Sequence, residues 1–377
     1  MNTTGIYLPG LNALRGFAAL LVAVFHFDSM VMHLTFSDNS WFVRNAYLMV
    51  DLFFIISGFI LFHLYGASFK KQLRKEAYLN FLRARIARIY PLHLFTLLVF
   101  VVLIYGSINP YMSGTLTDLI HDPKAIPTHL LLLQSFGFHK IFTWNLPSWS
   151  ISAEWFSYLL FPLLALFIAK QQSRSLLFLT VFATMVYLAI EYVLPRSKEI
   201  WSLPNARDIN VTYDYGFLRG LAGFIAGMLT YHLYNRKVLT PLVSRDSAGL
   251  FCLIIFFFFM NGEYNDLFYI PVFMTLVLCL ASNQEKMLQV CMFKPFQFLG
   301  DISYSIYMVH YVLILCVALP SIDLMGYTYT GPGSLHPPLF EGLSVCFVFL
   351  LVVAGVSYLS YSFVEKPWRR RINRAGT

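Results

Sequence analysis

Runs of apolar residues alternate with short polar connections along almost the whole chain. An α-helix needs about 20 apolar residues to cross a hydrocarbon core of about 30 Å, because it rises about 1.5 Å per residue. Segments of this kind lie at residues 11–34, 46–66, 88–106, 150–169, 175–194, 215–234, 247–260, 267–282, 299–320 and 339–363. The pattern predicts an all-α membrane protein with about ten transmembrane helices in one bundle, and residues 1–377 as a single integral-membrane domain.

Three segments depart from this simple pattern. Residues 247–260 are few for a full crossing, so this helix and 267–282 are the weakest predictions of the set. The apolar stretch from Ile126 to Phe138 is too short to span, and it predicts a re-entrant or interfacial helix that roofs a site. No small-residue cleavage site follows the first segment, so we expect that segment to be retained as an anchor and not removed as a signal peptide.

Basic residues gather in alternate connections. Charged residues make up 12% of the chain and hydrophobic residues 58%, while the net charge is +8. Most of the 27 Lys and Arg residues fall in the connections and the tail on the side of the N-terminus. The positive-inside bias then places both termini in the cytoplasm and the chain in the inner (cytoplasmic) membrane, and it accounts for the net charge without a nucleic-acid partner.

The cysteine pattern indicates no metal chemistry. Cys291 sits in a polar connection without a C-x-x-C partner. The other cysteines lie inside apolar segments, at Cys252, Cys279, Cys316 and Cys346. We therefore expect neither a disulfide framework nor a bound metal.

Ionisable residues at membrane depth cost about 2.5 to 3.5 kcal/mol each on insertion scales, so each is a functional candidate. Arg15 and His26 are eleven residues apart, which places them on one face of the first helix and about 16 Å apart along its axis. This spacing suits a long substrate such as coenzyme A, with phosphates at the cytosolic mouth and a reactive end deep in the bilayer. The alternative is that Arg15 is an orientation anchor and His26 a hydrogen-bonded bundle histidine.

Two carboxylates are expected near the depth of His26. Asp51 lies at the outer end of the second helix, where it is placed to orient the imidazole or to pair with an arginine. Glu154 lies at the outer start of the fourth helix, where it can fix the tautomer of a catalytic histidine or complement the helix dipole. Ser57 and Gly58, near the middle of the second helix, indicate close helix packing.

Two further groups of polar residues are candidates for binding the substrate. Arg85 and Arg88 face one way where a cytosolic connection meets the third helix, so they suit either the phosphates of coenzyme A or lipid headgroups. In the ninth helix, one stripe contains Ser303, Tyr307 and His310. This stripe either lines a thioester channel or bonds across helices.

Glycine and tryptophan positions have simpler interpretations. The spacings Gly216-x-x-x-Gly220 and Gly223-x-x-x-Gly227 in the sixth helix predict close packing. The tryptophans of the outer connections are typical of an aromatic belt, with stacking on sugar rings as the alternative: Trp144, Trp149 and Trp201.

The ordered set of motifs resembles a known family. Arg15 and His26 form Arg-x10-His within a stretch that begins Leu11-Asn-Ala-Leu-Arg-Gly-Phe. The blocks that follow in order are Asp51 to Phe59, the Arg-x-x-Arg of Arg85 and Arg88, Ser148 to Pro162, Gly300 to His310, and Glu365-Lys-Pro. From Leu8 to Trp368 the chain is similar to the acyltransferase 3 family of bacterial membrane O-acyltransferases.

The resemblance implies an enzyme that moves an acyl group, usually acetyl, from cytosolic acyl-CoA to a hydroxyl of an extracytoplasmic or lipid-linked glycan. By position, His26 is similar to the catalytic histidine of that family, Arg15 to its motif partner, and Arg85 and Arg88 to its Arg-x-x-Arg pair. We expect no fused hydrolase-like domain, which makes the chain similar to the stand-alone branch of the family.

These expectations combine into one mechanism. Acetyl-CoA or another acyl-CoA enters from the cytosol with its phosphates on Arg85, Arg88 and Arg15. His26, held by Glu154 or Asp51, then acts as general base on the acceptor hydroxyl, or forms an acyl-histidine intermediate. The alternative from another class is a transporter of lipid-linked sugar or a small solute, against which the hydrophobic segments show no inverted duplication.

Overall fold

The structure, a computed structural model, describes residues 7–32, 41–105, 120–169, 173–194, 208–237, 239–319, 325–326, 335 and 337–374. Trp201 and the basic residues Lys170, Arg196, Lys198 and Arg207 lie outside these ranges. The described part of the chain is mainly helical and holds no β-strand, although an isolated bridge joins Met32 and Leu335. The prediction of an all-α fold is confirmed.

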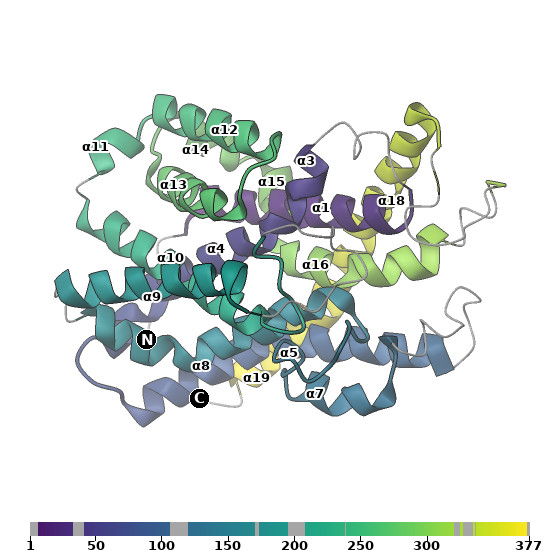
Figure 1. The fold of residues 1–377 in the computed structure, drawn as a ribbon, viewed down its shortest axis with the longest axis horizontal. Helices are drawn as coiled ribbons and strands as arrows, with labels where there is room; N and C mark the ends of the chain where they lie inside the picture. The colour runs from purple at the N-terminus through teal and green to yellow at the C-terminus, as the bar shows by residue number, and fades with distance from the viewer. Residues whose placement is uncertain are drawn as a thin grey trace.

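The longer helices run alongside one another in a single bundle (Figure 1). They are α1 (Pro9–Met30), α4 (Met49–Tyr65), α5 (Lys75–Tyr105), α8 (Trp149–Ala169), α9 (Ser173–Tyr192), α10 (Gly216–Arg236), α12 (Asp246–Met260), α13 (Tyr269–Ser282), α16 (Ser303–Leu313) and α18 (Leu339–Ser360). Shorter helices connect them or flank them: α3 (Trp41–Arg44), α7 (Ile126–Leu130), α11 (Thr240–Val243), α14 (Lys286–Cys291), α15 (Lys294–Asp301) and α19 (Lys366–Arg374).

Six described helical segments are long and apolar enough to cross a membrane, and a seventh is the bent pair formed by α15 and α16 with its π-helical extension. The helices α12 and α13 are apolar but have only 15 and 14 residues, as the short hydrophobic runs at these positions predict. The chain is therefore an all-α membrane protein, and ten crossings remain a prediction.

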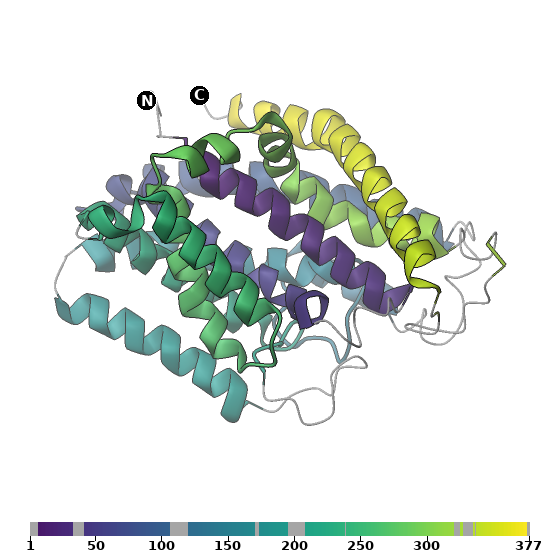
Figure 2. The same ribbon diagram turned by 90° about the horizontal axis from the view of Figure 1, so that it is seen from above.

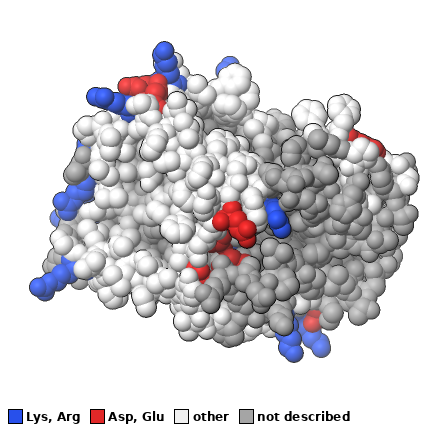
Figure 3. All heavy atoms as spheres, turned by 45° about the horizontal axis from the view of Figure 1, so that its top comes forward, with Lys and Arg blue, Asp and Glu red and all other residues white. Residues whose placement is uncertain are grey.

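The two ends of the described chain lie at the same end of the bundle. Figure 2 shows that α1 begins, and α19 ends, at this end. In Figure 3 most of the blue Lys and Arg spheres of the visible face lie toward the left, which is the same end of the long axis. The arrangement agrees with the expectation that both termini face one side of the membrane, the basic side.

Glycines let the central helices α4 and α10 approach closely. A Cβ atom added at Gly58 of α4 would overlap the backbone carbonyl of Phe224, and one added at Gly227 of α10 would overlap the carbonyl of Ile55. Small residues at such crossings permit backbone contact that any larger side chain prevents. Packing of α4 on α10 therefore confirms the interpretation of Gly58 and of the glycine pair that includes Gly227.

Two predicted helices have different bounds in the structure. The third extends back to Lys75, because its charged first half is made of good helix formers even though it is too polar for a hydropathy signal. The ninth is broken at Ile302, where α15 and α16 meet at 67°. Asn12 of α1 stabilises this break by donating hydrogen bonds to the carbonyl of Gln297 (3.1 Å) and to Asp301 (3.0 Å).

The outer segment after α5 differs more strongly from its prediction. Only Ile126–Leu130 is helical, and turns follow as far as Phe138. Leu132 has a left-handed backbone with φ of 55°, a conformation that interrupts an α-helix. The segment is held inward by Ser152 of α8, whose hydroxyl donates to the carbonyl of Leu132 (2.7 Å).

Candidate active site

An inner cavity of about 120 Å³ lies among α1, α4, α5, α8 and α16. We call it inner because Arg15, which lines it, stands near the beginning of α1 at the basic end of the bundle. Its polar lining residues are Arg15, Ser57, Arg85, Arg88, Ser150, Glu154, Tyr158, Ser303, Tyr304 and Tyr307. The structure thus brings together the three predicted cofactor-binding arginines, although they come from two helices.

The three arginines differ in how far their charges are compensated. Arg88 forms an ion pair with the buried Glu365, which also accepts a hydrogen bond from Ser305 (3.1 Å). Arg85 donates to the hydroxyl of Tyr65 (3.1 Å), but its buried Nε has no partner. Arg15 has no hydrogen bond or ion pair among the described residues. The cavity therefore offers unused guanidinium donors, which suit an anionic ligand.

Glu154 belongs to the inner cavity and not to the surroundings of His26. Its carboxylate accepts hydrogen bonds from Ser57 (2.6 Å) and Tyr158. The predicted contact between Glu154 and the imidazole of His26 is therefore absent among the described hydrogen bonds. The reason is that the first turn of α8 is buried, with Ser152 bonded to the outer segment, and the carboxylate of Glu154 meets Ser57 of α4.

An outer cavity of about 190 Å³ contains His26. It lies toward the end of α1, and its lining is a mixture of aromatic, polar and aliphatic side chains. They are Val22, Phe25, His26, Ser29, Met30, Tyr47, Val50, Phe142, Leu146, Trp149, Asn210, Thr212, Arg219 and Tyr307. Phe142 and Leu146 come from the part of the outer segment that follows Phe138, whereas no residue of the predicted roof, Ile126 to Phe138, lines either cavity.

His26 is hydrogen-bonded to His310 of α16, with 2.9 Å between Nδ1 of His26 and Nε2 of His310. Nδ1 of His310 lies 3.0 Å from the carbonyl oxygen of Ile306, which can only accept, so this nitrogen carries a proton. In a neutral His310 the Nε2 atom then accepts from Nδ1 of His26. This leaves Nε2 of His26 with a free lone pair, the state that a general base requires.

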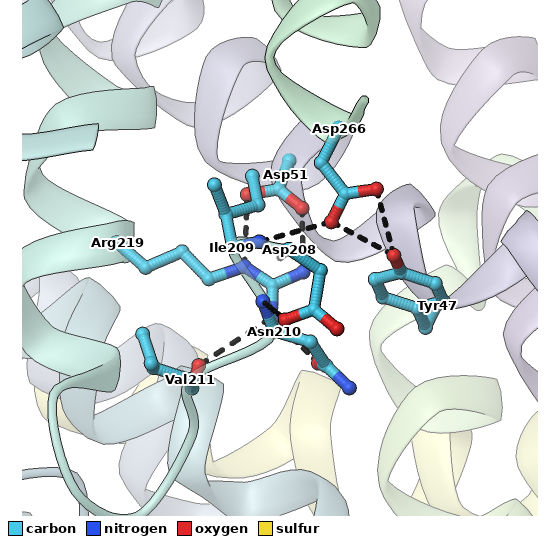
Figure 4. Close-up of polar contacts among 8 residues, drawn as sticks. All are labelled: Tyr47, Asp51, Asp208, Ile209, Asn210, Val211, Arg219 and Asp266. Atoms are coloured by element: carbon cyan, nitrogen blue, oxygen red, sulfur yellow. Dashed lines mark hydrogen bonds and ion pairs between the residues drawn. The ribbon is translucent and has the colours of Figure 1, made fainter. Parts of the chain in front are cut away.

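Asp51 does not contact His26. It forms a fully buried, two-pronged ion pair with Arg219 of α10, at 3.0 Å to Nε and 2.6 Å to Nη2 (Figure 4). The sequence predicted that Asp51 either orients the His26 imidazole or pairs with an arginine, and the structure shows the pairing with an arginine. Arg219 was not singled out from the sequence. The feature that could have identified it is a positively charged residue within a glycine-rich apolar helix.

Arg219 also fixes the chain segment that borders the outer cavity. Its Nη1 donates to Asn210 (2.9 Å) and to the carbonyl of Val211 (3.4 Å). The same segment is held from the other side by Asp266, which accepts from the amide of Ile209 (3.0 Å) and from Tyr47 (2.8 Å), as Figure 4 shows. The outer cavity is therefore bordered by a rigid polar network.

The predicted stripe on α16 divides between the two cavities. Ser303 lines the inner cavity, and its buried hydroxyl has no partner. Tyr307 lines both cavities, and its hydroxyl lies 2.7 Å from Ser150 Oγ and donates to the carbonyl of Pro147 (3.1 Å). His310 lines neither cavity and bonds across helices to His26.

Comparison with known proteins gives one family match and several relatives. A family profile described as "Acyltransferase domain" matches residues 8–361. The O-acetyltransferase OatA of Staphylococcus aureus is 25% identical over 97% of this chain and 58% of its own length. The putative peptidoglycan O-acetyltransferase YrhL of Bacillus subtilis is 23% identical over 96% of this chain and 55% of its own.

A third relative covers a shorter region. The acyltransferase MdmB of Streptomyces mycarofaciens is 32% identical over 52% of this chain and 49% of its own length. The chain thus spans about half the length of the curated relatives that it matches. No solved structure matches it.

Proposed function

Since the chain belongs to the Acyltransferase domain family, we propose that it transfers an acyl group, in the first instance acetyl, from an acyl-CoA to a hydroxyl of an extracytoplasmic or lipid-linked glycan. The observation that carries the proposal is the pair of cavities at successive depths along α1. One offers unpaired arginines and the other a histidine with a free ring nitrogen. A donor with a charged end and a reactive end fits this arrangement.

The inner cavity provides the donor site. Arg15 and Arg85 have unused donors there, and guanidinium groups bind phosphates through paired, charge-assisted hydrogen bonds. We assign the phosphates of the acyl-CoA to this basic end, with the pantetheine arm directed along α1 toward His26. Arg88 already has Glu365 as partner and serves mainly to hold the cavity wall.

The outer cavity provides the acceptor site. Nε2 of His26 takes the proton from the acceptor hydroxyl while the hydroxyl oxygen attacks the carbonyl carbon of the thioester. The new C–O bond forms and the C–S bond breaks. The leaving sulfur then receives the proton from His26, so that the products are the acylated glycan and free coenzyme A. His310 keeps the imidazole in the tautomer that this step needs.

The glycan acceptor is inferred from two sources. Relatives that match nearly the whole chain carry the names O-acetyltransferase and putative peptidoglycan O-acetyltransferase. In this chain, the outer cavity combines the aromatic faces of Trp149 and Phe142 with the polar side chains of Asn210 and Thr212. Such a lining suits a sugar ring, which has apolar faces and polar edges.

The test is transfer of radiolabelled acetyl from acetyl-CoA to the envelope glycan fraction by membranes that contain the protein. We expect labelling by the wild type, and its loss by about 10²- to 10⁴-fold in His26→Ala, the usual size of a general-base effect. The matched control is His63→Ala on α4, because His63 is half-buried, is bonded to Tyr231 and lines neither cavity.

Three outcomes are informative. Equal labelling by folded His26→Ala and wild type would show that His26 is not the base. Absence of labelling with any acyl-CoA would refute the proposed donor. Initial-rate patterns in both substrates separate direct transfer from an acyl-histidine route, since only the latter gives ping-pong kinetics.

A further inference from the structure

The C-terminal helix α19 is fixed against α5 by one buried carboxylate. Glu365 is 1% exposed, forms the ion pair with Arg88 of α5 and accepts a hydrogen bond from Ser305 of α16 (3.1 Å). It is the last residue of the π-helical turn Tyr361–Glu365, which leads from α18 into α19. Directly after this turn α19 packs against α5 (Figure 1). Glu365 therefore sets which face of α19 is turned toward Arg88.

Arg369 lies on that face. It follows Glu365 by four residues, which is about one helical turn, so the two side chains point the same way. Arg369 is close enough to Arg88 and Arg85 to interact with both electrostatically. Its side chain is exposed, whereas those of Arg85 and Arg88 are partly buried, and it makes no hydrogen bond or ion pair with the described residues. Arg369 thus extends the arginines of the inner cavity to the surface of the bundle.

Positive charge is in excess in this group of interacting side chains. Its described members are the cations Arg15, Arg85, Arg88 and Arg369 and the carboxylates Glu154 and Glu365. Two positive charges therefore remain without a counter-ion in the described part of the chain. Such charges repel one another where the dielectric constant is low, so the arrangement favours an anionic ligand.

The inner cavity is too small to enclose the whole proposed donor. Its volume of about 120 Å³ is below the roughly 300–1,000 Å³ of a site that encloses a drug-sized ligand, and an acyl-CoA is larger than such a ligand. The end of the donor furthest from the thioester must then lie outside the cavity, at the basic end of the bundle. That end is the adenosine with its 3′-phosphate, while the diphosphate lies between it and the pantetheine arm.

We propose that Arg369 binds the 3′-phosphate of the acyl-CoA, so that α19 forms part of the donor site. The inference rests on the proposed function. Arg15 and Arg85 line the inner cavity and take the diphosphate, whereas Arg369 lies at the surface and takes the phosphate at the far end of the molecule. The ion pair of Arg88 with Glu365 holds the two parts of the site together, because it joins α5 to the start of α19.

The test compares acetyl-CoA with acetyl-3′-dephospho-CoA as donors in the membrane transfer assay. The wild type should have a KM about 10-fold lower for acetyl-CoA, the low end of a charge-assisted hydrogen bond because the site is exposed. Arg369→Gln should raise the KM for acetyl-CoA to that of the dephospho donor and leave the latter unchanged. Arg369→Lys keeps the charge and should retain part of the preference.

The matched control is Arg370→Gln. Arg370 is the next residue of α19 and is also exposed, so its replacement removes the same charge from the same helix. Its side chain lies about 100° further around the helix, where it lines a surface groove with Lys366 and Arg371. We expect the KM values of this variant for both donors to equal those of the wild type.

The outcomes separate the inference from the proposed function. Equal rises in KM for both donors in Arg369→Gln would overturn the inference, because Arg369 would then act on a shared part of the donors or on lipid headgroups. Equal effects of Arg369→Gln and Arg370→Gln would also overturn it, since they indicate general attraction by a basic surface. A wild type that uses both donors with one KM would refute the inference without any variant and leave the proposed function standing. A wild type that uses neither donor would instead refute the proposed function.

Discussion

Nδ1 of His26 lies 2.9 Å from Nε2 of His310, although the two residues are 284 positions apart in the chain. Their rings are stacked with 5.0 Å between centroids, and the second ring nitrogen of His310 is committed to the carbonyl of Ile306. A backbone carbonyl in α16 thus acts through two imidazoles, together with the backbone hydrogen bond of His26 to Val22, on which nitrogen of His26 is free to accept a proton.

These hydrogen bonds predict that His310 acts by positioning the His26 imidazole and not by contact with the substrate. His310→Phe removes the imidazole partner of His26 Nδ1 and leaves His26 with its backbone hydrogen bond to Val22 alone. We expect kcat to fall by about 10²-fold or more, since a wrongly held histidine tautomer costs up to about 10⁴-fold. KM for acetyl-CoA should stay unchanged, because His310 lines neither cavity. His310→Gln restores an acceptor oxygen and should recover part of kcat. A fall in kcat together with a rise in KM in both variants would indicate a purely structural role for His310.

Replacement of the two arginines of the Arg-x-x-Arg pair should have different effects, one on substrate binding and the other on stability. Arg85 has unused donors, so Arg85→Ala should raise KM for acyl-CoA by roughly 10- to 100-fold, the value of a charge-assisted hydrogen bond, with little change in thermal stability. Substrate titration at low and high salt measures this effect.

Arg88→Ala should act through folding instead. It leaves Glu365, whose side chain is 1% exposed, as a buried carboxylate without its cation, at a cost of about 3–5 kcal/mol. Thermal unfolding in detergent measures the loss, and adding Glu365→Gln to Arg88→Ala should recover much of it. A normal unfolding temperature for Arg88→Ala would contradict this account.

Removal of one partner of the Asp51–Arg219 ion pair should destabilise the bundle much more than removal of both partners. Both side chains are fully buried, so Asp51→Asn should lower the free energy of unfolding by about 3–5 kcal/mol. The double variant Asp51→Leu with Arg219→Met should unfold near the wild-type temperature, because it removes both charges. Its transfer to glycan should stay low, since Asn210 and Val211 lose the donor that holds them beside the outer cavity.

Close packing of α4 on α10 predicts contrasting effects of two glycine substitutions. Gly58→Ala places a Cβ against the carbonyl of Phe224 and should destabilise the fold by about 1–3 kcal/mol. Gly355→Ala in α18 is the control, because a Cβ there meets nothing within 4 Å and alanine favours the helix by about 0.5–1 kcal/mol. Unfolding temperatures of the two variants should therefore move in opposite directions.

Much of the fold could be predicted from the sequence because membrane insertion imposes a simple rule on each segment separately. A helix that crosses lipid must be long and apolar, so the positions of most helices, the short α12 and α13, and the side of the bundle that carries the basic residues follow from local composition. The functional candidates followed from the same rule, since Arg15, His26 and Glu154 are costly in lipid.

Only the tertiary structure decided which of these residues meet. The depth of a residue along its helix does not determine which neighbouring helix it faces. Glu154 of α8 therefore lines the inner cavity with the arginines, while His26 is hydrogen-bonded to His310. The partner of Asp51 depended on the close crossing of α4 and α10 at Gly58 and Gly227. Pairings between distant segments depend on helix tilt, rotation and loop folding, which are set jointly by the packed bundle and by no single stretch of sequence.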